Sequence, residues 1–173
     1  MNDLDLAAYK AVFPDWAKRI GLCAKVGLLS PWSEQTALLR ELFPDAKVTA
    51  LSKREWDLNN PGKESFDLLA AMSVLYLAED PGIWLRNILA RCRVFWMQDH
   101  VRRRRGGPDT EFVGESADGV ERWRFALPGF RPEADVPTWT VPLERLTAWH
   151  VYSGGERHGR SAVHFLAAFR GEL

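Results

Sequence analysis

Apolar residues in the middle of the chain form two short continuous runs, separated by a segment with helical spacing. The first run is Phe66 to Met72 and the second is Val94 to Met97, and apolar side chains recur at helical intervals over Ile83 to Leu89. Continuous apolar runs are typical of strands that are covered on both faces of a parallel sheet. Asp80 and Pro81 predict where the helix begins, because Asp caps helices and Pro is tolerated in the first turn. We therefore predict a strand–helix–strand unit with a right-handed crossover.

The N-terminal part of the chain predicts further strand–helix pairs. Ala24 to Leu29 and Lys47 to Leu51 are predicted strands, joined through a helix over Glu34 to Leu42 for which Ser33 is the expected N-cap. Residues 3–20 predict a short helix, a break at Pro14 and one more turn. A third, very short strand is predicted at Trp56 to Leu58, before a turn over residues 59–62.

The pattern changes after His100. Arg102 to Pro108 is a predicted basic loop, and Glu111 to Gly119 is predicted to be mobile or lid-like. Val120 to Leu127 alternates and fits either a strand or a short helix. We therefore expect residues 102–142 to form an irregular insertion.

The last apolar runs predict an antiparallel hairpin. They cover Leu143 to Tyr152 and Ser161 to Phe169, on either side of a glycine-rich connection at residues 153–159. The order of elements predicts one α/β domain over residues 1–173, with an N-terminal helical segment at residues 1–22. Its sheet is expected to be mostly parallel, with helices on both faces and the hairpin at its C-terminal edge.

The composition of the chain indicates a globular protein and does not favour binding to nucleic acid or to a membrane. A chain of 173 residues that is 46% hydrophobic fits one globular domain with a substantial core. Basic and acidic residues number 23 each, so net charge does not favour nucleic acid or an anionic membrane. Cys23 and Cys92 lie in apolar company and are expected to be buried thiols in a reducing compartment. No signal peptide or membrane-length apolar run is present, and we expect a soluble cytoplasmic protein.

The chain from Ala24 to Arg170 resembles the class I S-adenosylmethionine-dependent methyltransferases. The resemblance lies in the segments AKVGLLS…TALLRELFPDAKVTALS, FDLLAAMSVLYLAEDP, RVFWMQD and HFLAAFRG. It implies a three-layer Rossmann-like fold in which the hairpin supplies a reversed strand. It also implies a glycine-rich cofactor loop after the first strand and a ribose-binding carboxylate after the second. The segment after the strand that ends at Met72 would line the cofactor and acceptor sites.

The sequence departs from that family at both cofactor anchors. The loop segment, Ser30 to Gln35, contains no glycine and includes Pro31 and Trp32, although glycine is the residue that lets backbone approach a ligand. Ser52 stands where the ribose carboxylate is expected, and Asp57 matches a later acidic position that touches the adenine amine in some members. The cofactor-binding positions that the resemblance implies are Ser30, Trp32, Ser33, Ser52, Asp57 and Ser73.

Three residues are candidates for catalysis. Asp99 and His100 follow a predicted central strand. A histidine can act as a general base near neutral pH, and a neighbouring carboxylate can orient it. Adjacent residues on a strand point to opposite faces, however, so the two side chains pair only if the chain turns there. Tyr76 lies where the resemblance places the acceptor pocket. The alternative for Asp99 and His100 is that they are solvated polar groups at the end of a strand. The alternative for Tyr76 is that it packs on the neighbouring helix.

Other polar clusters carry weaker hypotheses. His150 and His164 would face each other across the hairpin, but neither a carboxylate nor a cysteine completes a metal-ligand pattern, and no metal is expected. Arg102 to Arg105 would suit a phosphate or nucleic acid, and a solvated face or a protein contact is the favoured interpretation.

Two functions compete. The favoured one is a pseudoenzyme that retains the methyltransferase fold, has impaired or lost S-adenosylmethionine binding and acts through an unknown protein partner. Here Trp32 is the leading candidate to fill the cofactor cleft. The alternative is an active methyltransferase for a small molecule or glycan. A nucleic-acid-binding module is a third, less favoured class.

Overall fold

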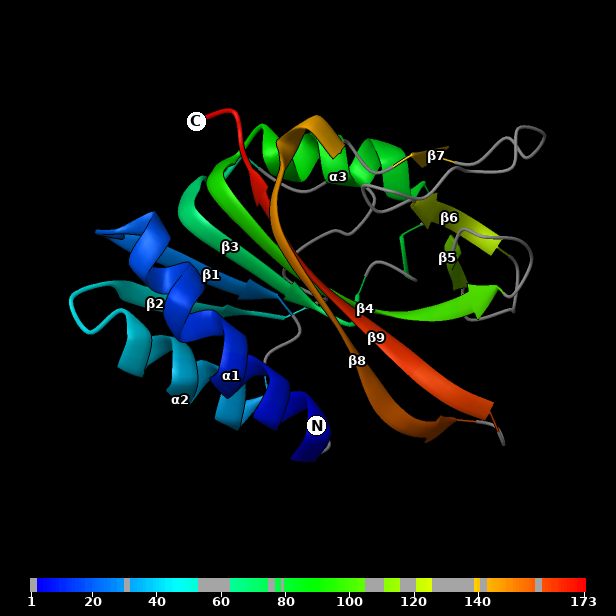
Figure 1. Ribbon diagram of the computed structural model, residues 1–173. Coiled ribbons are helices and arrows are strands. Elements are labelled where there is room, and N and C mark those ends of the chain that lie inside the picture. Colours follow the sequence, from blue (N-terminus) through cyan, green and yellow to red (C-terminus); the bar gives the residue numbers. More distant parts are fainter. Residues whose placement is uncertain are drawn as a thin grey trace.

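A computed structural model of the chain describes residues 3–29, 32–52, 63–74, 77–78, 80–104, 111–115, 121–125, 139–140, 143–157 and 160–173. Its centre is a mixed sheet with the strand order β2-β1-β3-β4-β9-β8 (Figure 1). The first four of these strands run parallel, and β9 is antiparallel to both β4 and β8. The strands are β1 (Lys25–Leu29), β2 (Lys47–Leu51), β3 (Phe66–Met72), β4 (Cys92–Arg104), β8 (Leu146–Arg157) and β9 (Arg160–Arg170).

Three shorter strands continue the sheet from the distal end of β4. The residues Arg102 to Arg104 pair with β5 (Glu111–Glu115), β5 pairs with β6 (Glu121–Phe125), and β6 pairs with β7 (Trp139–Thr140). In Figure 1 this ladder lies to one side of the central sheet, beyond the last contact between β3 and β4. A short 3-10 turn, Leu143–Arg145, then leads into β8.

Helices cover both faces of the sheet. The helices α1 (Asp3–Ile20) and α2 (Ser33–Leu42) lie on one face, and α3 (Pro81–Leu89) lies on the other (Figure 1). This arrangement confirms the predicted α/β class with its layered, mostly parallel sheet and reversed C-terminal hairpin. Among the described residues, no helix combines the length and apolarity needed to cross a membrane.

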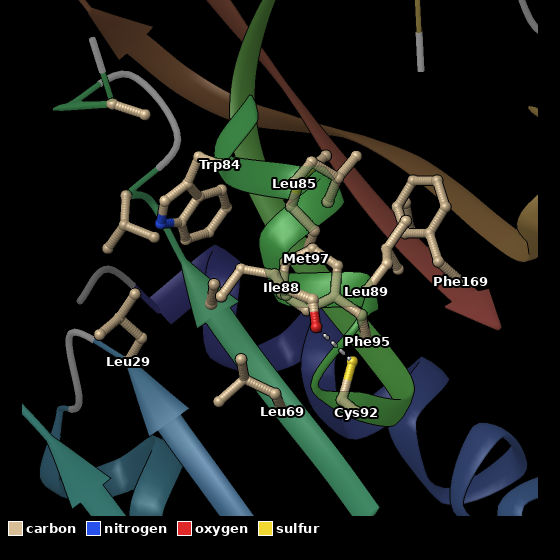
Figure 2. Packing of buried hydrophobic residues seen from close by; sticks show 14 of the residues in the cluster. Leu29, Leu69, Trp84, Leu85, Ile88, Leu89, Cys92, Phe95, Met97 and Phe169 are labelled. Atoms are coloured by element: carbon tan, nitrogen blue, oxygen red, sulfur yellow. Dashed lines mark hydrogen bonds between the residues drawn. The ribbon is translucent and has the colours of Figure 1, made fainter. Parts of the chain in front are cut away.

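The parallel strands are buried because each presents apolar side chains to both layers. On β4, Phe95 and Met97 face α3, whereas Trp96 faces α1 and α2. Figure 2 shows the α3 side, where Trp84 and Ile88 of that helix pack over the strands. Each of these fully buried side chains contributes about 1.5–3 kcal/mol to folding.

Helix α1 corrects the prediction of a break at Pro14, because it is continuous over Asp3–Ile20 with Pro14 inside. Its apolar face stacks on the sheet: the rings of Tyr9 and Phe13 are 5.0 Å apart, and Phe13 lies 4.6 Å from Trp96. Proline in a helix interior costs about 3 kcal/mol, which the burial of several large aromatic side chains exceeds.

Helix α2 corrects the predicted N-cap. Ser33 is the first helical residue, and Trp32 occupies the cap position with extended backbone. The Trp32 backbone N–H donates to Gln35 Oε1 at 3.1 Å, so a side chain one turn into the helix satisfies this N–H. For α3 the prediction is confirmed, since Asp80 Oδ1 accepts a hydrogen bond from the Ile83 N–H at 2.9 Å.

Strand β4 is much longer than the predicted run over Val94 to Met97. It extends to Arg104 because β9 pairs with it through Val101 and β5 pairs with it from Arg102 onwards. The predicted basic loop is therefore wrong over Arg102 to Arg104, which are strand residues. Within residues 102–142 the structure describes three strands where the sequence predicts irregular chain, and β6 agrees with one of the two interpretations of Val120 to Leu127.

Strands β8 and β9 confirm the hairpin, although both are longer than predicted. The glycine-rich segment up to Arg157 belongs to β8, because the pairing with β9 continues to Arg157 and Arg160. Cys23 and Cys92 are buried free thiols. The predicted strand at Trp56 to Leu58 lies outside the described residues.

Candidate functional site

The parallel strands bring three of the predicted site residues to the same edge of the sheet. In register, Leu29 at the end of β1 lies between Leu51 of β2 and Ala71 of β3. Ser52 and Ser73 directly follow β2 and β3, and Trp32 lies between β1 and α2. Open α/β sheets bind ligands beyond the carboxyl ends of their strands. We call this set of strand ends the carboxyl edge.

Ser73 has the most unusual backbone at the carboxyl edge. Its φ is +55°, in the left-handed region that residues with a side chain rarely adopt. Two bonds to one residue hold it there: the Ser73 N–H donates to the Gln98 carbonyl oxygen at 2.7 Å, and Ser73 Oγ donates to Gln98 Oε1 at 2.6 Å. Such conformations persist only where the surrounding structure enforces them, and they gather at functional sites.

Gln98 connects Ser73 to a set of buried polar side chains behind the carboxyl edge. Gln98 Nε2 lies 2.8 Å from His164 Nδ1, and that nitrogen lies 3.1 Å from Asp5 Oδ1. The Tyr152 hydroxyl donates to the same Asp5 oxygen at 2.7 Å. We call Asp5, Gln98, Tyr152 and His164 the buried polar cluster. It joins α1, β4, β8 and β9, and its cost of desolvation is met by hydrogen bonds among its members.

The phenol of Tyr152 is a hydrogen-bond donor in this cluster. Burial, followed by the neighbouring Tyr9 and Asp5, raises the pKa of Tyr152 far above its ordinary value. Burial together with Asp5 also raises the pKa of Tyr9. Both hydroxyl groups therefore stay protonated above the pH at which an exposed tyrosine ionises, because a phenolate would be buried beside a carboxylate.

The first turn of α2 is linked to the same region. Gln35 is buried, and its Nε2 donates to the Tyr9 hydroxyl at 3.4 Å while its Oε1 accepts from the Trp32 N–H. The Trp32 side chain itself is 52% exposed, so the indole stands at the surface of the carboxyl edge. Ser33 Oγ donates to Glu34 at 2.8 Å, and this bond, after the backbone N–H of Glu34 itself, lowers the pKa of the Glu34 carboxyl.

Asp99 and His100 are not at the end of a strand, as the sequence predicts, but inside β4. Asp99 is 1% exposed, and strand alternation places it on the α3 face, away from Gln98. His100 pairs in register with His164, and the structure describes only its backbone. The interpretation of this pair as solvated groups at a strand end is wrong for Asp99, because β9 continues alongside β4.

The histidines of the hairpin are also arranged differently from the prediction. His150 pairs in register with Leu166, and Tyr152 is the residue opposite His164. The described part of the chain contains no group of three or more His, Cys, Asp or Glu side chains placed to hold a metal ion.

Three predicted site residues, Ser30, Asp57 and Tyr76, lie outside the described residues. Ser52 is half-buried beyond β2. The buried polar cluster was not predicted as a unit, because Asp5 and Tyr152 are 147 positions apart. The available signal was modest: Gln98 was recognisable as a polar residue after an apolar run, and His164 as a histidine within one.

The comparison with solved structures supports the fold. Neither a family model nor a curated protein matches the sequence. The crystal structure of the N-terminal domain of EvdMO1 with SAH bound matches with a TM-score of 0.53 and 10% identity, over 99% of this chain and 83% of that one. A S-adenosylmethionine-dependent methyltransferase from Clostridium acetobutylicum has a TM-score of 0.48 and 12% identity, over 98% of this chain and 94% of that one.

The chain has a class I methyltransferase-like fold. In this methyltransferase-like fold, Ser52 and Ser73 directly follow β2 and β3 at the carboxyl edge, and Trp32 is the first described residue after β1; none of the three is a carboxylate. The predicted cofactor positions that the structure describes therefore offer hydroxyl groups and an indole.

The methyltransferase-like fold also has a hollow of about 240 Å³ at the opposite edge of the sheet. Its walls include Trp16, Trp96 and Phe169, with Arg19 and Arg170 beside them. It lies near the start of β4 and the end of β9, so it is separate from the carboxyl edge.

Proposed function

We propose that this chain is a methyltransferase-like protein with impaired S-adenosylmethionine binding, which acts by associating with another protein at its carboxyl edge. The observation that carries this proposal is Trp32, a half-exposed indole at the N-cap of α2, where the resembled family has a glycine-rich cofactor loop. Ser52 stands where that family has a ribose-binding carboxylate. Both changes weaken contacts to an adenosyl ligand, because a side chain obstructs close backbone approach and a hydroxyl lacks the second carboxylate oxygen.

Exposed apolar side chains support association at this edge. Trp32 is 52% exposed before α2, and Ile83 is 48% exposed in the first turn of α3. The two helices cover opposite faces of the sheet and both begin at the carboxyl edge (Figure 1). Tryptophan is enriched among the residues that dominate the energy of protein interfaces.

The test of cofactor binding is thermal unfolding with and without S-adenosylhomocysteine, together with calorimetric titration. A ligand that binds only the folded state adds about 2.7 kcal/mol at a concentration 100 times its dissociation constant. We expect no shift and no binding heat at about 1 mM ligand, and a shift in Trp32→Gly, which removes the side chain. Micromolar binding by the unaltered chain would contradict impaired affinity.

The test of association uses Trp32→Ser, with Trp149→Ser as the matched control because Trp149 is 44% exposed on β8, four strands away from β1 in the sheet. A partner captured by the unaltered chain should be lost with Trp32→Ser and kept with Trp149→Ser. Equal retention by both variants would place the interface elsewhere and overturn the proposal for this edge.

A second function, an active methyltransferase for a small molecule or glycan, is favoured by Ser73. A left-handed serine held by two hydrogen bonds is costly to retain in a site without a ligand. In this case the cofactor would bind along residues 30–35, Ser52 and Asp57, with the acceptor near Ser73, Tyr76, Asp99 and His100. Micromolar S-adenosylhomocysteine binding that Ser73→Pro abolishes and Thr49→Ala leaves unchanged would support this function.

A further inference from the structure

One nitrogen atom in the buried polar cluster has neighbours with conflicting requirements. His164 Nδ1 lies 2.8 Å from Gln98 Nε2, which can only donate, and 3.1 Å from Asp5 Oδ1, which accepts when ionised. The Tyr152 hydroxyl lies 3.4 Å from Nδ1 and donates its hydrogen to Asp5. Without a proton, Nδ1 accepts from Gln98 but turns its lone pair towards Asp5. With a proton, Nδ1 donates to Asp5 but meets the N–H groups of Gln98. The orientation of the Gln98 amide in this structure therefore fits only the unprotonated nitrogen.

Rotation of the Gln98 amide by half a turn resolves the conflict in the protonated state. The amide oxygen and nitrogen have nearly the same size, so the rotation exchanges a donor and an acceptor without repacking. Gln98 Oε1 then accepts a hydrogen bond from His164 Nδ1–H. Gln98 Nε2 then takes the position that Oε1 has in this structure, 2.6 Å from Ser73 Oγ.

The rotation changes what Ser73 offers to a ligand. In the amide orientation of this structure, Ser73 Oγ donates its hydrogen to Gln98 Oε1, so only the lone pairs of Ser73 Oγ remain for other partners. In the rotated orientation Ser73 Oγ accepts from Gln98, so its hydrogen is released. Ser73 is half-buried and follows β3 at the carboxyl edge, so a ligand at the candidate site would meet Ser73 Oγ either as an acceptor or as a donor.

We propose that the proton on His164 Nδ1 decides, through the orientation of the Gln98 amide, whether Ser73 acts as a hydrogen-bond acceptor or donor at the carboxyl edge. His164 and Gln98 are thus positioning residues that set the specificity of Ser73. The proposal concerns the free protein and goes beyond the proposed function, since the two states of Ser73 exist whether or not an adenosyl ligand binds.

The titratable groups around His164 come from three elements of the fold. From α1, Asp5 contacts the ring directly and Tyr9 lies next to Asp5. From β8, the ring of Tyr152 lies 5.0 Å from that of His164, and the ring of His150 is stacked on Tyr152 at 6.1 Å. From β4, His100 is the backbone partner of His164, and Asp99 points to the other face of the sheet. Among the described residues, the Asp5 carboxylate is an acidic group in direct contact with this ring.

Nuclear magnetic resonance on the free chain tests the proposal. Long-range ¹H–¹⁵N spectra report whether His164 Nδ1 carries a proton, and the Gln98 side-chain amide signals report its hydrogen-bond partner. As pH is varied over the range in which the chain is folded, we expect the Gln98 signals to change together with the Nδ1 proton, at one common midpoint. A His164 Nδ1 that gains its proton while the Gln98 signals stay constant would overturn the proposal, as would an Nδ1 whose protonation stays the same over the whole pH range in which the chain is folded.

Two variants and one control separate this role from a structural one. Tyr152→Phe removes a hydrogen bond to Asp5, which strengthens the demand of Asp5 for the His164 proton and should move the midpoint to higher pH. Gln98→Glu offers only acceptors and should keep Nδ1 protonated throughout the range. His150→Asn changes the neighbouring histidine, which makes no hydrogen bond to Gln98, and should leave the midpoint within about 0.2 pH units. A midpoint that Tyr152→Phe leaves unmoved contradicts the proposal even if Gln98→Glu fails to fold.

A ligand arm uses adenosine and S-adenosylhomocysteine as probes. If a probe binds, its affinity should depend on pH with the His164 midpoint in the unaltered chain and lose that dependence in Gln98→Glu. An affinity that does not follow this midpoint would refute the role of the switch in binding. Absence of binding by both probes bears on the cofactor site alone, because the spectra of the free chain test the switch separately.

Discussion

At the scale of single residues, Ser73 and Gly171 show how the backbone tolerates only certain side chains. Ser73 has a left-handed backbone that a side chain disfavours by about 1–2 kcal/mol. Gly171 lies against the backbone of β4, donating its N–H to the Arg93 carbonyl at 2.8 Å. Both positions are determined by close tertiary contacts.

Ser73→Gly and Ser73→Ala form a matched pair that isolates the backbone strain. Both variants lose the bond from Ser73 Oγ to Gln98, but only glycine relieves the positive φ. We expect the glycine variant to be more stable than the alanine variant by about 1 kcal/mol in urea unfolding. Equal stabilities would mean that the backbone at this position relaxes without cost.

Gly27→Ala and Gly171→Ala differ in what the added methyl group meets. At Gly27 it would approach side-chain carbons of Leu69 and Phe66 at 2.8 Å, and these can move, so we expect a loss of about 1–3 kcal/mol. At Gly171 it would overlap the carbonyl group of Cys92, which is fixed in β4, so we expect a loss above about 3 kcal/mol. Urea unfolding of both variants measures the order, and the reverse order would show that the chain end after β9 is free to move.

At the scale of elements, pairing partners decide how long each strand is. β3 ends at Met72, opposite Gln98, yet β4 continues to Arg104 because β9 and β5 supply new partners. The other end of β3 is joined to β1 by a side chain: Asp67 Oδ2 accepts from the N–H groups of Ala24 and Lys25 at 2.8 and 2.9 Å. These two bonds hold the first residues of β1 against β3.

Asp67→Asn should reduce stability in a pH-dependent way. The N–H of Lys25, then that of Ala24, lowers the pKa of Asp67 in the folded chain, despite a smaller opposing effect of burial. The contribution of the carboxylate is therefore present above the unfolded value of about 3.9 and is lost as pH falls through the folded value. We expect a difference of about 1 kcal/mol between the unaltered chain and Asp67→Asn at pH 7.

Urea unfolding of both proteins from neutral to acidic pH measures this difference, and Asp15→Asn is the control because Asp15 is exposed on α1. The difference between Asp67→Asn and the unaltered chain should shrink below about pH 4. A constant difference over the whole range would show that ionisation of Asp67 does not contribute.

At the scale of the whole molecule, two hydrophobic layers enclose the sheet, and the α3 layer contains a fully buried thiol. Cys92 Sγ donates to the Ile88 carbonyl oxygen at 3.3 Å (Figure 2). Burial raises the pKa of the Cys92 thiol to about 12. The folded chain therefore keeps a proton that the unfolded chain releases near pH 8.5.

The stability of the molecule should accordingly fall at alkaline pH. The contribution of Cys92 is complete below the unfolded pKa and is lost as pH rises towards the folded value, and the buried phenols of Tyr9 and Tyr152 act in the same direction. Cys92→Ala should reduce the decline of unfolding free energy by up to about 1.4 kcal/mol per pH unit between about pH 9 and pH 11.

Cys23→Ala is the matched control for that decline. Burial raises the pKa of Cys23 as well, but the hydrogen bond and charge of Arg93 oppose the effect. Cys23→Ala should therefore change the decline less than Cys92→Ala does. Identical declines in all three proteins would show that thiol burial does not govern alkaline stability.

The sequence by itself determined the local elements and the fold class. The bounds of β2 and β3 agree with the predicted runs Lys47 to Leu51 and Phe66 to Met72, and Asp80 caps α3 as predicted. These features depend on apolar runs and on capping residues within a few positions, so they can be predicted from a single sequence.

Only the tertiary structure decided the continuity of α1 through Pro14, the length of β4 and the composition of the buried polar cluster. Packing against Trp96 outweighs the local effect of Pro14, and a strand continues where another strand happens to pair with it. Asp5 and Tyr152 lie 147 positions apart and meet because α1 crosses the sheet next to β8. Contacts of that kind depend on how the layers pack against each other, and local sequence patterns do not predict this packing.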